Sequence, residues 1–265
     1  QSAPPRGNVV NLLKTFFFAC AILATGAAQA EKLTIAAAAD LKCAMDEIVA
    51  HFKAENPQEQ IEVIYGSSGK FHAQIRQGAP YDLYFSADIA FAEQLLQAGH
   101  AASEVIPYAL GRLVLWSSNL DATKLTLASL TDPKITRIAI ANPKHAPYGK
   151  RAEEALRASK VWEQVERKLV YGENIAHAAQ FVQTGNAQVG IIALALVLNP
   201  SLADKGGYYL IPEHLHAPLE QGFIITKRAA GNASAKRFAD YMKSPASRIT
   251  MTKYGFVLPG ESAVK

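Results

Sequence analysis

The stretch IAIANPKHAPYG, residues 138–149, joins an apolar run to a helical pattern through a loop that contains two prolines. It predicts a strand over residues 136–141 and, after the break at Pro147, a helix over residues 150–159. Two similar junctions precede it, AAAAD at residues 36–40 and YGSSGK at residues 65–70. Each ends a strand pattern, contains small or turn-forming residues and opens a helix. Repeated junctions of this kind indicate an α/β fold.

The same alternation continues on both sides of these junctions. It predicts mainly parallel sheets with helices on both faces. Such sheets bind ligands beyond the carboxyl ends of their strands, where the helices begin. The other predicted strands cover residues 32–38, 61–65, 82–86, 112–116, 188–192 and 223–226, and the other helices cover 41–54, 70–77, 89–98, 175–184, 233–243 and 245–254.

A helix that begins at such a junction can hold an anion. Its first N–H groups have no partner within the helix and carry the positive end of the helix dipole. Backbone donors and hydroxyls can therefore bind an anion without an arginine. For any single junction, ordinary N-capping by Ser or Asp is the alternative explanation. Three junctions in one chain favour an anion site.

The first 30 residues differ in composition from the rest. They contain Arg6 and Lys14 but no acidic residue, then the apolar run TFFFACAILAT, and they end on Ala28-Gln29-Ala30. A basic leader, a short apolar core and small residues before a cleavage point predict a signal peptide over residues 1–30 and a periplasmic protein. The apolar run is shorter than the ~20 residues that a membrane span needs, although a retained anchor is the alternative.

The charge balance and the cysteine content argue against a nucleic-acid-binding protein and against an intramolecular disulfide. The leader holds two of the 27 basic residues and none of the 23 acidic ones, so the rest of the chain is almost neutral. Nucleic acid binding requires a clustered basic face and is not expected. With Cys20 in the leader, Cys43 has no partner for an intramolecular disulfide, and its apolar spacing predicts a small buried side chain.

Several motifs together resemble the periplasmic molybdate-binding proteins of ABC importers, and they span essentially the whole chain after the leader. GAPYDLYFSAD and the NP-x-x-APYG turn are the specific ones, whereas GSSG alone is weak. The matching segments are AAADL at 37–41, GSSG at 66–69, GAPYDLYFSAD at 78–88, GRLVLWS at 111–117, IAIANPKHAPYG at 138–149, VGIIA at 189–193 and YGFVLP at 254–259.

The resemblance implies a two-lobed periplasmic-binding-protein fold with a ligand cleft between the lobes. One lobe is expected to take residues 31–112 together with 222–265, and the other residues 113–221. The implied ligand is molybdate or tungstate, without a cofactor or a bare metal cation. The implied partners are the membrane permease subunits of an ABC transporter, with no catalysis and no stable self-association.

The same resemblance places the oxyanion-binding residues at Ala39, Asp40, Ser68, Tyr148 and Ile175. Ser68 should offer both its hydroxyl and its N–H, and Ile175 the N–H of a helix start. A tyrosine that some family members place directly after the VGII-type strand is Ala193 here. Tyr148 stands where those members have alanine, so its ring is expected to fill that space.

Asp40 stands where Ser or Asn is commoner in the family. A carboxylate that faces a dianion in a dry cleft is repelled by roughly several kcal/mol. We therefore expect its side chain to cap its own helix, while Lys42 and Lys70 either offset the ligand's charge or lie on the surface as solvated lysines. In that case every group facing the ligand is a donor, and phosphate, which keeps a proton at neutral pH, should bind at least about tenfold more weakly than molybdate.

Two alternatives remain open. The chain is either a binding protein for another tetrahedral anion, such as sulfate or thiosulfate, or a secreted serine hydrolase or phosphatase that uses Ser68. GSSG lacks the G-x-S-x-G spacing of a nucleophile elbow. Glu213, His214 and His216 form a weak metal-ligand pattern, and loop polar groups are the simpler interpretation.

Overall fold

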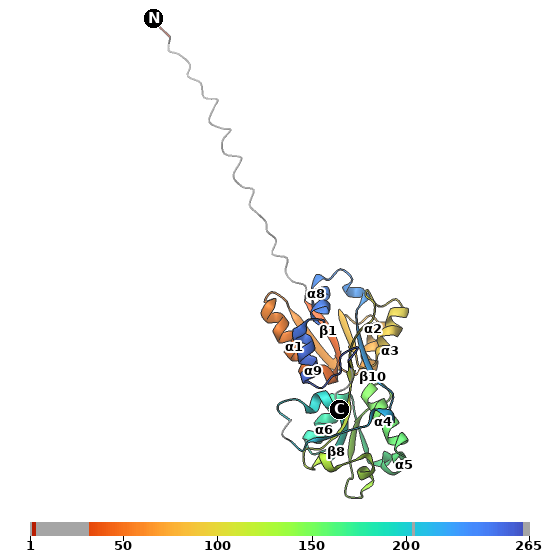
Figure 1. The fold of residues 1–265 in the computed structure, drawn as a ribbon. Helices are drawn as coiled ribbons and strands as arrows, with labels where there is room; N and C mark the ends of the chain where they lie inside the picture. The colour runs from red at the N-terminus through yellow and green to blue at the C-terminus, as the bar shows by residue number, and fades with distance from the viewer. Residues whose placement is uncertain (1, 4–31, 203–204, 262–265) are drawn as a thin grey trace.

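Two five-stranded sheets form the centres of two lobes, which lie one above the other in Figure 1. The computed structural model describes residues 2–3, 32–202 and 205–261. The predicted signal peptide therefore lies outside the described residues, apart from residues 2 and 3. The first sheet has the order β2-β1-β3-β10-β4 and contains β1 (Leu33–Ala38), β2 (Ile61–Gly66), β3 (Leu83–Ser86), β4 (Ile106–Gly111) and β10 (Leu219–Ile225).

The second sheet repeats this arrangement. Its order is β7-β6-β8-β5-β9, and it contains β5 (Leu113–Trp116), β6 (Ile138–Ala141), β7 (Leu169–Gly172), β8 (Val189–Ala193) and β9 (Tyr208–Leu210). The chain crosses between the sheets twice, at Arg112 and again between β9 and β10. The expected α/β class and two-lobed form are confirmed.

Both sheets are mixed. β1 pairs in parallel with β2 and β3, and β6 pairs in parallel with β7 and β8. β10 runs antiparallel to β3 and β4, and β5 runs antiparallel to β8 and β9. The antiparallel strands are those next to the crossovers. β5 follows β4 with only Arg112 between them, and no α-helix separates β9 from β10, so neither β5 nor β10 enters its sheet through the long helical crossover that parallel pairing needs.

Helices lie on both sides of each sheet, as predicted (Figure 1). The first lobe carries α1 (Lys42–Glu55), α2 (Ser68–Arg76), α3 (Ile89–Gln97), α8 (Ala233–Tyr241) and α9 (Pro245–Lys253), and the second carries α4 (Pro147–Ala158), α5 (Trp162–Val165), α6 (Ile175–Gln183) and α7 (Leu194–Val197). Short 3-10 helices are η1 (Ala39–Leu41), η2 (Ala122–Lys124), η3 (Leu127–Thr131), η4 (Glu166–Lys168), η5 (Glu213–Leu215) and η6 (Lys227–Ala229).

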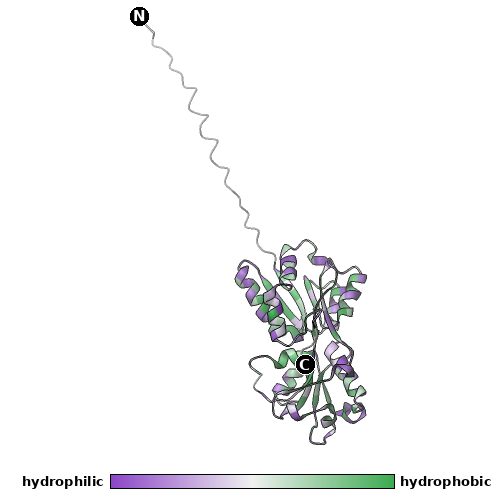
Figure 2. Cartoon of the chain, in the orientation of Figure 1, coloured by the Kyte–Doolittle hydropathy of each residue, from purple (hydrophilic) through white to green (hydrophobic). Residues whose placement is uncertain are grey.

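The strands of both sheets are mainly hydrophobic (Figure 2), and the buried apolar residues of each lobe cluster on its strands and helices. In the first lobe, Phe85 and Phe223 stack with their ring centroids 4.5 Å apart, and Phe238 of α8 meets Phe85 edge-on. Trp116 and Ile140 are fully buried in the second lobe. Cys43 is only partly buried, contrary to prediction, because the chain around it faces a groove between the lobes.

The parallel strands place their carboxyl ends together. Ala38 at the end of β1 is in register with Gly66 of β2, and Ala141 of β6 is in register with Gly172 of β7. The helices η1, α2, α4 and α6 begin shortly after these four ends. No helix within the described ranges is long and apolar enough to span a membrane.

Candidate functional site

The five residues expected to bind the oxyanion all line one small cavity between the lobes. The free volume inside it is about 10 Å³, roughly the space of a single water-sized sphere. A tetrahedral oxyanion therefore requires the lobes or the lining side chains to move before it enters. The lining consists of Ala38, Ala39, Asp40, Gly66, Ser67, Ser68, Ala87, Ala146, Pro147, Tyr148 and Ile175.

Backbone donors reach this cavity from the starts of helices. Ser68 is the first residue of α2, Tyr148 the second of α4 and Ile175 the first of α6. An N–H group in the first turn has no acceptor within its own helix. Asn174 caps α6 through the N–H of His177, at 3.0 Å, and so leaves the N–H of Ile175 uncapped.

Ser68 is held so that its hydroxyl proton remains available. Its Oγ accepts a hydrogen bond from the N–H of Ala87 at 3.0 Å, and its carbonyl oxygen accepts one from the Tyr84 hydroxyl at 2.7 Å. A hydroxyl that already accepts a bond keeps its own proton to donate. The side chain and the N–H of Ser68 can thus both donate to one anion.

Asp40 does not cap its helix, so that prediction is wrong. Its side chain is fully buried, and its Oδ2 accepts hydrogen bonds from the Tyr148 hydroxyl at 2.9 Å and from Gln221 Nε2 at 2.7 Å. Its Oδ1 accepts no hydrogen bond. The partners lie on α4 and β10, far away in sequence, and they supply the side-chain hydrogen bonds to this carboxylate.

A polar network that was not predicted lies behind the cavity. Gln221 Oε1 accepts a hydrogen bond from the Tyr108 hydroxyl at 2.7 Å, and Gln221 Nε2 also lies 3.2 Å from the Tyr148 hydroxyl. Gln221 is a fully buried amide inside the otherwise mostly apolar strand β10. A polar residue in such a run is the signal that can reveal a buried network. A side chain at Gly111 would collide with the Tyr148 hydroxyl, so glycine is required there.

Burial controls the ionisation of this network. Desolvation raises the pKa of Asp40 from 3.8 to about 6, although the hydrogen bonds from Gln221 and Tyr148 and the N–H groups of Asp40 and Leu41 favour its charged form. Desolvation also raises the pKa of Tyr148 and of Tyr108 well above 10, with the charge of Asp40 adding to the effect. Both tyrosines are therefore neutral donors at physiological pH.

The rim of the cavity joins the two lobes. Gly69 of α2 donates its N–H to the carbonyl of His145 at 2.9 Å, and the Ser67 hydroxyl lies 2.8 Å from His145 Nδ1. A Cβ atom at Gly69 would lie 2.6 Å from the His145 carbonyl oxygen, so the lobes approach this closely only because residue 69 is glycine. Lys70 pairs with Glu173 across the same boundary.

The two lysines expected near the ligand do not line the cavity. Lys42 binds Asp46 at 3.0 Å and Lys70 binds Glu173, and the side chains of both lysines are about half exposed. They therefore behave as paired surface lysines, the alternative given for them. Ala193 is fully buried and does not reach the cavity, whereas Tyr148 does.

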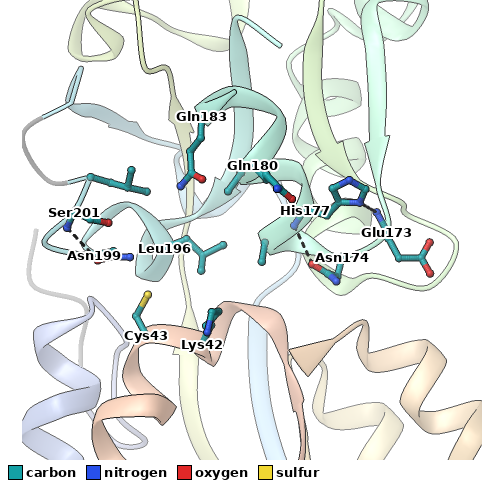
Figure 3. A pocket seen from close by; sticks show the side chains of 13 residues that line it. Lys42, Cys43, Glu173, Asn174, His177, Gln180, Gln183, Leu196, Asn199 and Ser201 are labelled. Atoms are coloured by element: carbon teal, nitrogen blue, oxygen red, sulfur yellow. Dashed lines mark hydrogen bonds between the residues drawn. The ribbon is translucent and has the colours of Figure 1, made fainter. Parts of the chain in front are cut away.

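A larger groove of about 790 Å³ opens beside the cavity (Figure 3). Lys42 and Cys43 at the start of α1 face Gln180 and Gln183 of α6 across it, and Asn199 and Ser201 line one end. None of the five expected ligand residues lines this groove. Among the described residues, no group of three or more His, Cys, Asp or Glu side chains is placed to hold a metal ion.

Two α/β lobes with the starts of several helices gathered at one cavity between them are the arrangement of a protein that binds a ligand between its lobes. Residues 33–257 match the family described as bacterial extracellular solute-binding protein, and the chain belongs to this family. The family consists of solute-binding proteins that act outside the cytoplasm, so the chain is a binding protein and not an enzyme.

Within this family, the chain is similar to several molybdate-binding proteins. The chain is 35% identical over 231 residues to the molybdate-binding protein ModA of Rhodobacter capsulatus, covering 87% of this chain and 90% of that protein. It is 34% identical over 233 residues to ModA of Azotobacter vinelandii, covering 88% and 92%. The solved periplasmic molybdate-binding protein of Azotobacter vinelandii superposes with a TM-score of 0.81 at 29% identity, covering 86% of this chain and all of that one.

Solved structures that share only the fold include the sulfate-binding protein SubI of Mycobacterium tuberculosis. It superposes with a TM-score of 0.70 at 14% identity, covering 86% of this chain and 87% of that one. At this level of identity, the similarity concerns the two-lobed fold alone.

Proposed function

We propose that this protein captures molybdate, and also tungstate, and delivers it to the membrane permease subunits of an ABC transporter. One observation carries the proposal: Ala39, Asp40, Ser68, Tyr148 and Ile175 all line a single cavity between the lobes. The named ModA relatives, which cover most of this chain, support the same ligand.

The proposed binding mode uses neutral donors. The N–H groups of Ala39, Ser68, Tyr148 and Ile175 and the hydroxyl of Ser68 would surround the oxyanion, at the positive ends of helix dipoles. Hydrogen bonds to a charged group contribute about 1.5–3 kcal/mol each, which is enough for several of them to hold a dianion without an arginine or a lysine.

The proposed site spans both lobes. We assign one lobe to about residues 31–112 with 222–265 and the other to about 113–221, although β10 of the first sheet already begins at Leu219. Ala39, Asp40 and Ser68 then belong to one lobe, and Tyr148 and Ile175 to the other. A ligand that bonds to both lobes stabilises the closed form, because only the closed form completes its hydrogen bonds. The closed form is what the permease subunits would recognise.

Selectivity needs a different reason from the one that the sequence suggested. The expected rejection of phosphate required Asp40 to cap its helix, and Asp40 lines the cavity instead. We therefore assign discrimination among tetrahedral anions to size, with molybdate and tungstate preferred over the smaller sulfate. Calorimetric titration of the purified protein with molybdate, tungstate and sulfate tests this order. Tighter binding of sulfate than of molybdate would reverse the assignment.

A hydrolase that uses Ser68 remains the rival from another class. Within the described part of the chain, Ser68 Oγ bonds to the Ala87 N–H and to no histidine or carboxylate that could act as a base. Turnover of a generic ester or phosphate ester by the purified protein is the discriminating assay, and we expect none.

Export completes the proposal. We assign residues 1–30 to a cleaved signal peptide, so that the mature chain begins at Glu31 in the periplasm and works as a monomer. N-terminal sequencing of secreted protein tests the cleavage point, and a first residue before Thr15 would contradict it. Light scattering of the mature protein tests the monomer.

A further inference from the structure

Asp40 lines a cavity that is proposed to bind an anion, and it carries an ionisable carboxyl group. Among the described residues of the lining, it alone carries a carboxyl group. Its Oδ2 has two donors, Tyr148 and Gln221, whereas its Oδ1 is buried without any. An ionised carboxylate beside a dianion is repelled strongly in a dry site, and the bare Oδ1 would bear most of that cost.

Among the described residues, no cation lines the cavity beside this carboxylate. Arg112 follows Gly111 near the Tyr148 hydroxyl, but its buried Nε has no hydrogen-bond partner and its side chain does not line the cavity. Other cations on the surrounding elements pair with carboxylates outside the cavity. Lys42 on α1 binds Asp46, Lys70 on α2 pairs with Glu173, and Arg151 on α4 lies near Asp88 and Glu154.

The other titratable groups of the surrounding elements place no positive charge in the cavity either, because neither histidine lines it. Tyr148 on α4 and Tyr108 on β4 are neutral, and burial raises the pKa of the Cys43 thiol on α1. His145, whose pKa is lowered by burial, hydrogen-bonds Ser67, and His177 on α6 accepts a hydrogen bond from the Glu173 N–H. A proton is the remaining means of removing the repulsion.

We propose that the bound oxyanion and Asp40 Oδ1 share one proton, so that Asp40 determines which protonation state of the ligand binds. This role of Asp40 rests on the proposed function. A fully deprotonated anion such as molybdate draws the proton from solvent onto Asp40, which then donates a hydrogen bond from Oδ1. An anion that carries its own proton, such as hydrogen phosphate, donates to the ionised carboxylate instead.

The proton makes molybdate affinity depend on pH. Burial already raises the pKa of Asp40 to about 6 in the free protein, so uptake near neutral pH is accessible. The bound anion raises that pKa further, since it favours the protonated form. Affinity is therefore constant below about pH 6 and falls by about tenfold for each pH unit above it, until the pKa of the complex is reached.

The test is calorimetric titration of the mature protein with sodium molybdate from about pH 6 to pH 8.5, at each pH in two buffers that differ in ionisation heat. The difference between the buffers counts the protons taken up. We expect the uptake to approach one proton per molybdate at pH 8. This measurement needs no variant, so it stands even if a substitution at Asp40 impairs folding.

Three variants test whether Asp40 is the group that takes up the proton when molybdate binds. Asp40→Asn offers a permanent amide donor in the same shape, so it should bind molybdate without proton uptake and at least about tenfold more tightly than the natural protein at pH 8. Asp46→Asn removes a nearby carboxylate outside the cavity, and His145→Gln removes a nearby histidine. Both should keep the pH dependence of the natural protein.

The outcomes separate this role of Asp40 from the proposed function. Molybdate binding with an affinity that is flat across the range and without proton uptake overturns the shared proton and leaves the function standing. A pH dependence that disappears in His145→Gln and persists in Asp40→Asn also overturns it. Absence of molybdate binding by the natural protein at every pH overturns both.

Discussion

Replacing Asp40 by Asn should stabilise the ligand-free protein at high pH but not at low pH. The folded-state pKa of Asp40 is about 6, against 3.8 in an unperturbed chain. A raised carboxyl pKa means that the folded protein holds its proton more tightly than the unfolded chain does. The contribution of Asp40 to stability is therefore greatest below pH 3.8, falls as the pH rises from 3.8 to 6, and stays lowered above that.

The size of the effect follows from the shift. A difference of about two pKa units corresponds to roughly 3 kcal/mol of free energy of unfolding lost between acid and neutral pH. The amide of Asn can accept from Tyr148 and Gln221 as Asp40 does, and it carries no charge to desolvate. We expect Asp40→Asn to gain about 1–3 kcal/mol at pH 8, or a melting temperature higher by about 2–12 °C for a protein of this size.

Denaturant titrations followed by circular dichroism at about pH 4, 6 and 8 measure this free energy for both proteins. Asp46→Asn is the matched control, because Asp46 is half exposed and its replacement should not reproduce the pH-dependent gain. An advantage of Asp40→Asn that is the same at all three pH values would refute the reasoning. So would a loss of stability at pH 8, since it would mean that the buried carboxylate is stabilising.

Three further changes test separate parts of the site. Ser68→Ala removes one hydroxyl donor and should weaken molybdate binding by about 1–3 kcal/mol. An unchanged affinity by calorimetry would mean that the GSSG segment begins a helix but does not bind the ligand through this hydroxyl. Gly69→Ala places a Cβ against the His145 carbonyl and should weaken molybdate binding because it hinders closure of the lobes. Small-angle scattering in excess molybdate should show a more open shape than for the natural protein, and an equally closed shape would contradict this. Tyr148→Phe removes a hydrogen bond that lowers the pKa of Asp40, so the fall of molybdate affinity with pH should begin at a higher pH. An affinity that falls at the same pH as in the natural protein would contradict this role of the hydrogen bond.

Local patterns allowed much of this architecture to be predicted. Strand-to-helix junctions are encoded by neighbouring residues, so the starts of α2, α4 and α6 fall close to where the sequence placed them. The resemblance supplied the five ligand positions, and the structure gathers all of them at one cavity. Whether they hold the ligand stays a prediction.

Long-range pairing set the limit of prediction. The hydrogen bond between Asp40 and Gln221 joins residues 181 positions apart, and the one to Tyr148 joins residues 108 positions apart. From the sequence, a local capping bond was the available partner for Asp40. The antiparallel direction of the strands next to the crossovers was not predicted either. Strand direction there depends on how the chain connects the lobes and not on residue periodicity.

The most direct test of the account is a crystal structure of the mature protein grown with molybdate, with diffraction data collected at the molybdenum absorption edge. We predict a single strong anomalous peak per molecule in the cavity, with ligand oxygens within hydrogen-bonding distance of the N–H groups of Ser68, Tyr148 and Ile175. A peak in the groove beside Cys43, or no peak in crystals that contain molybdate, would contradict it.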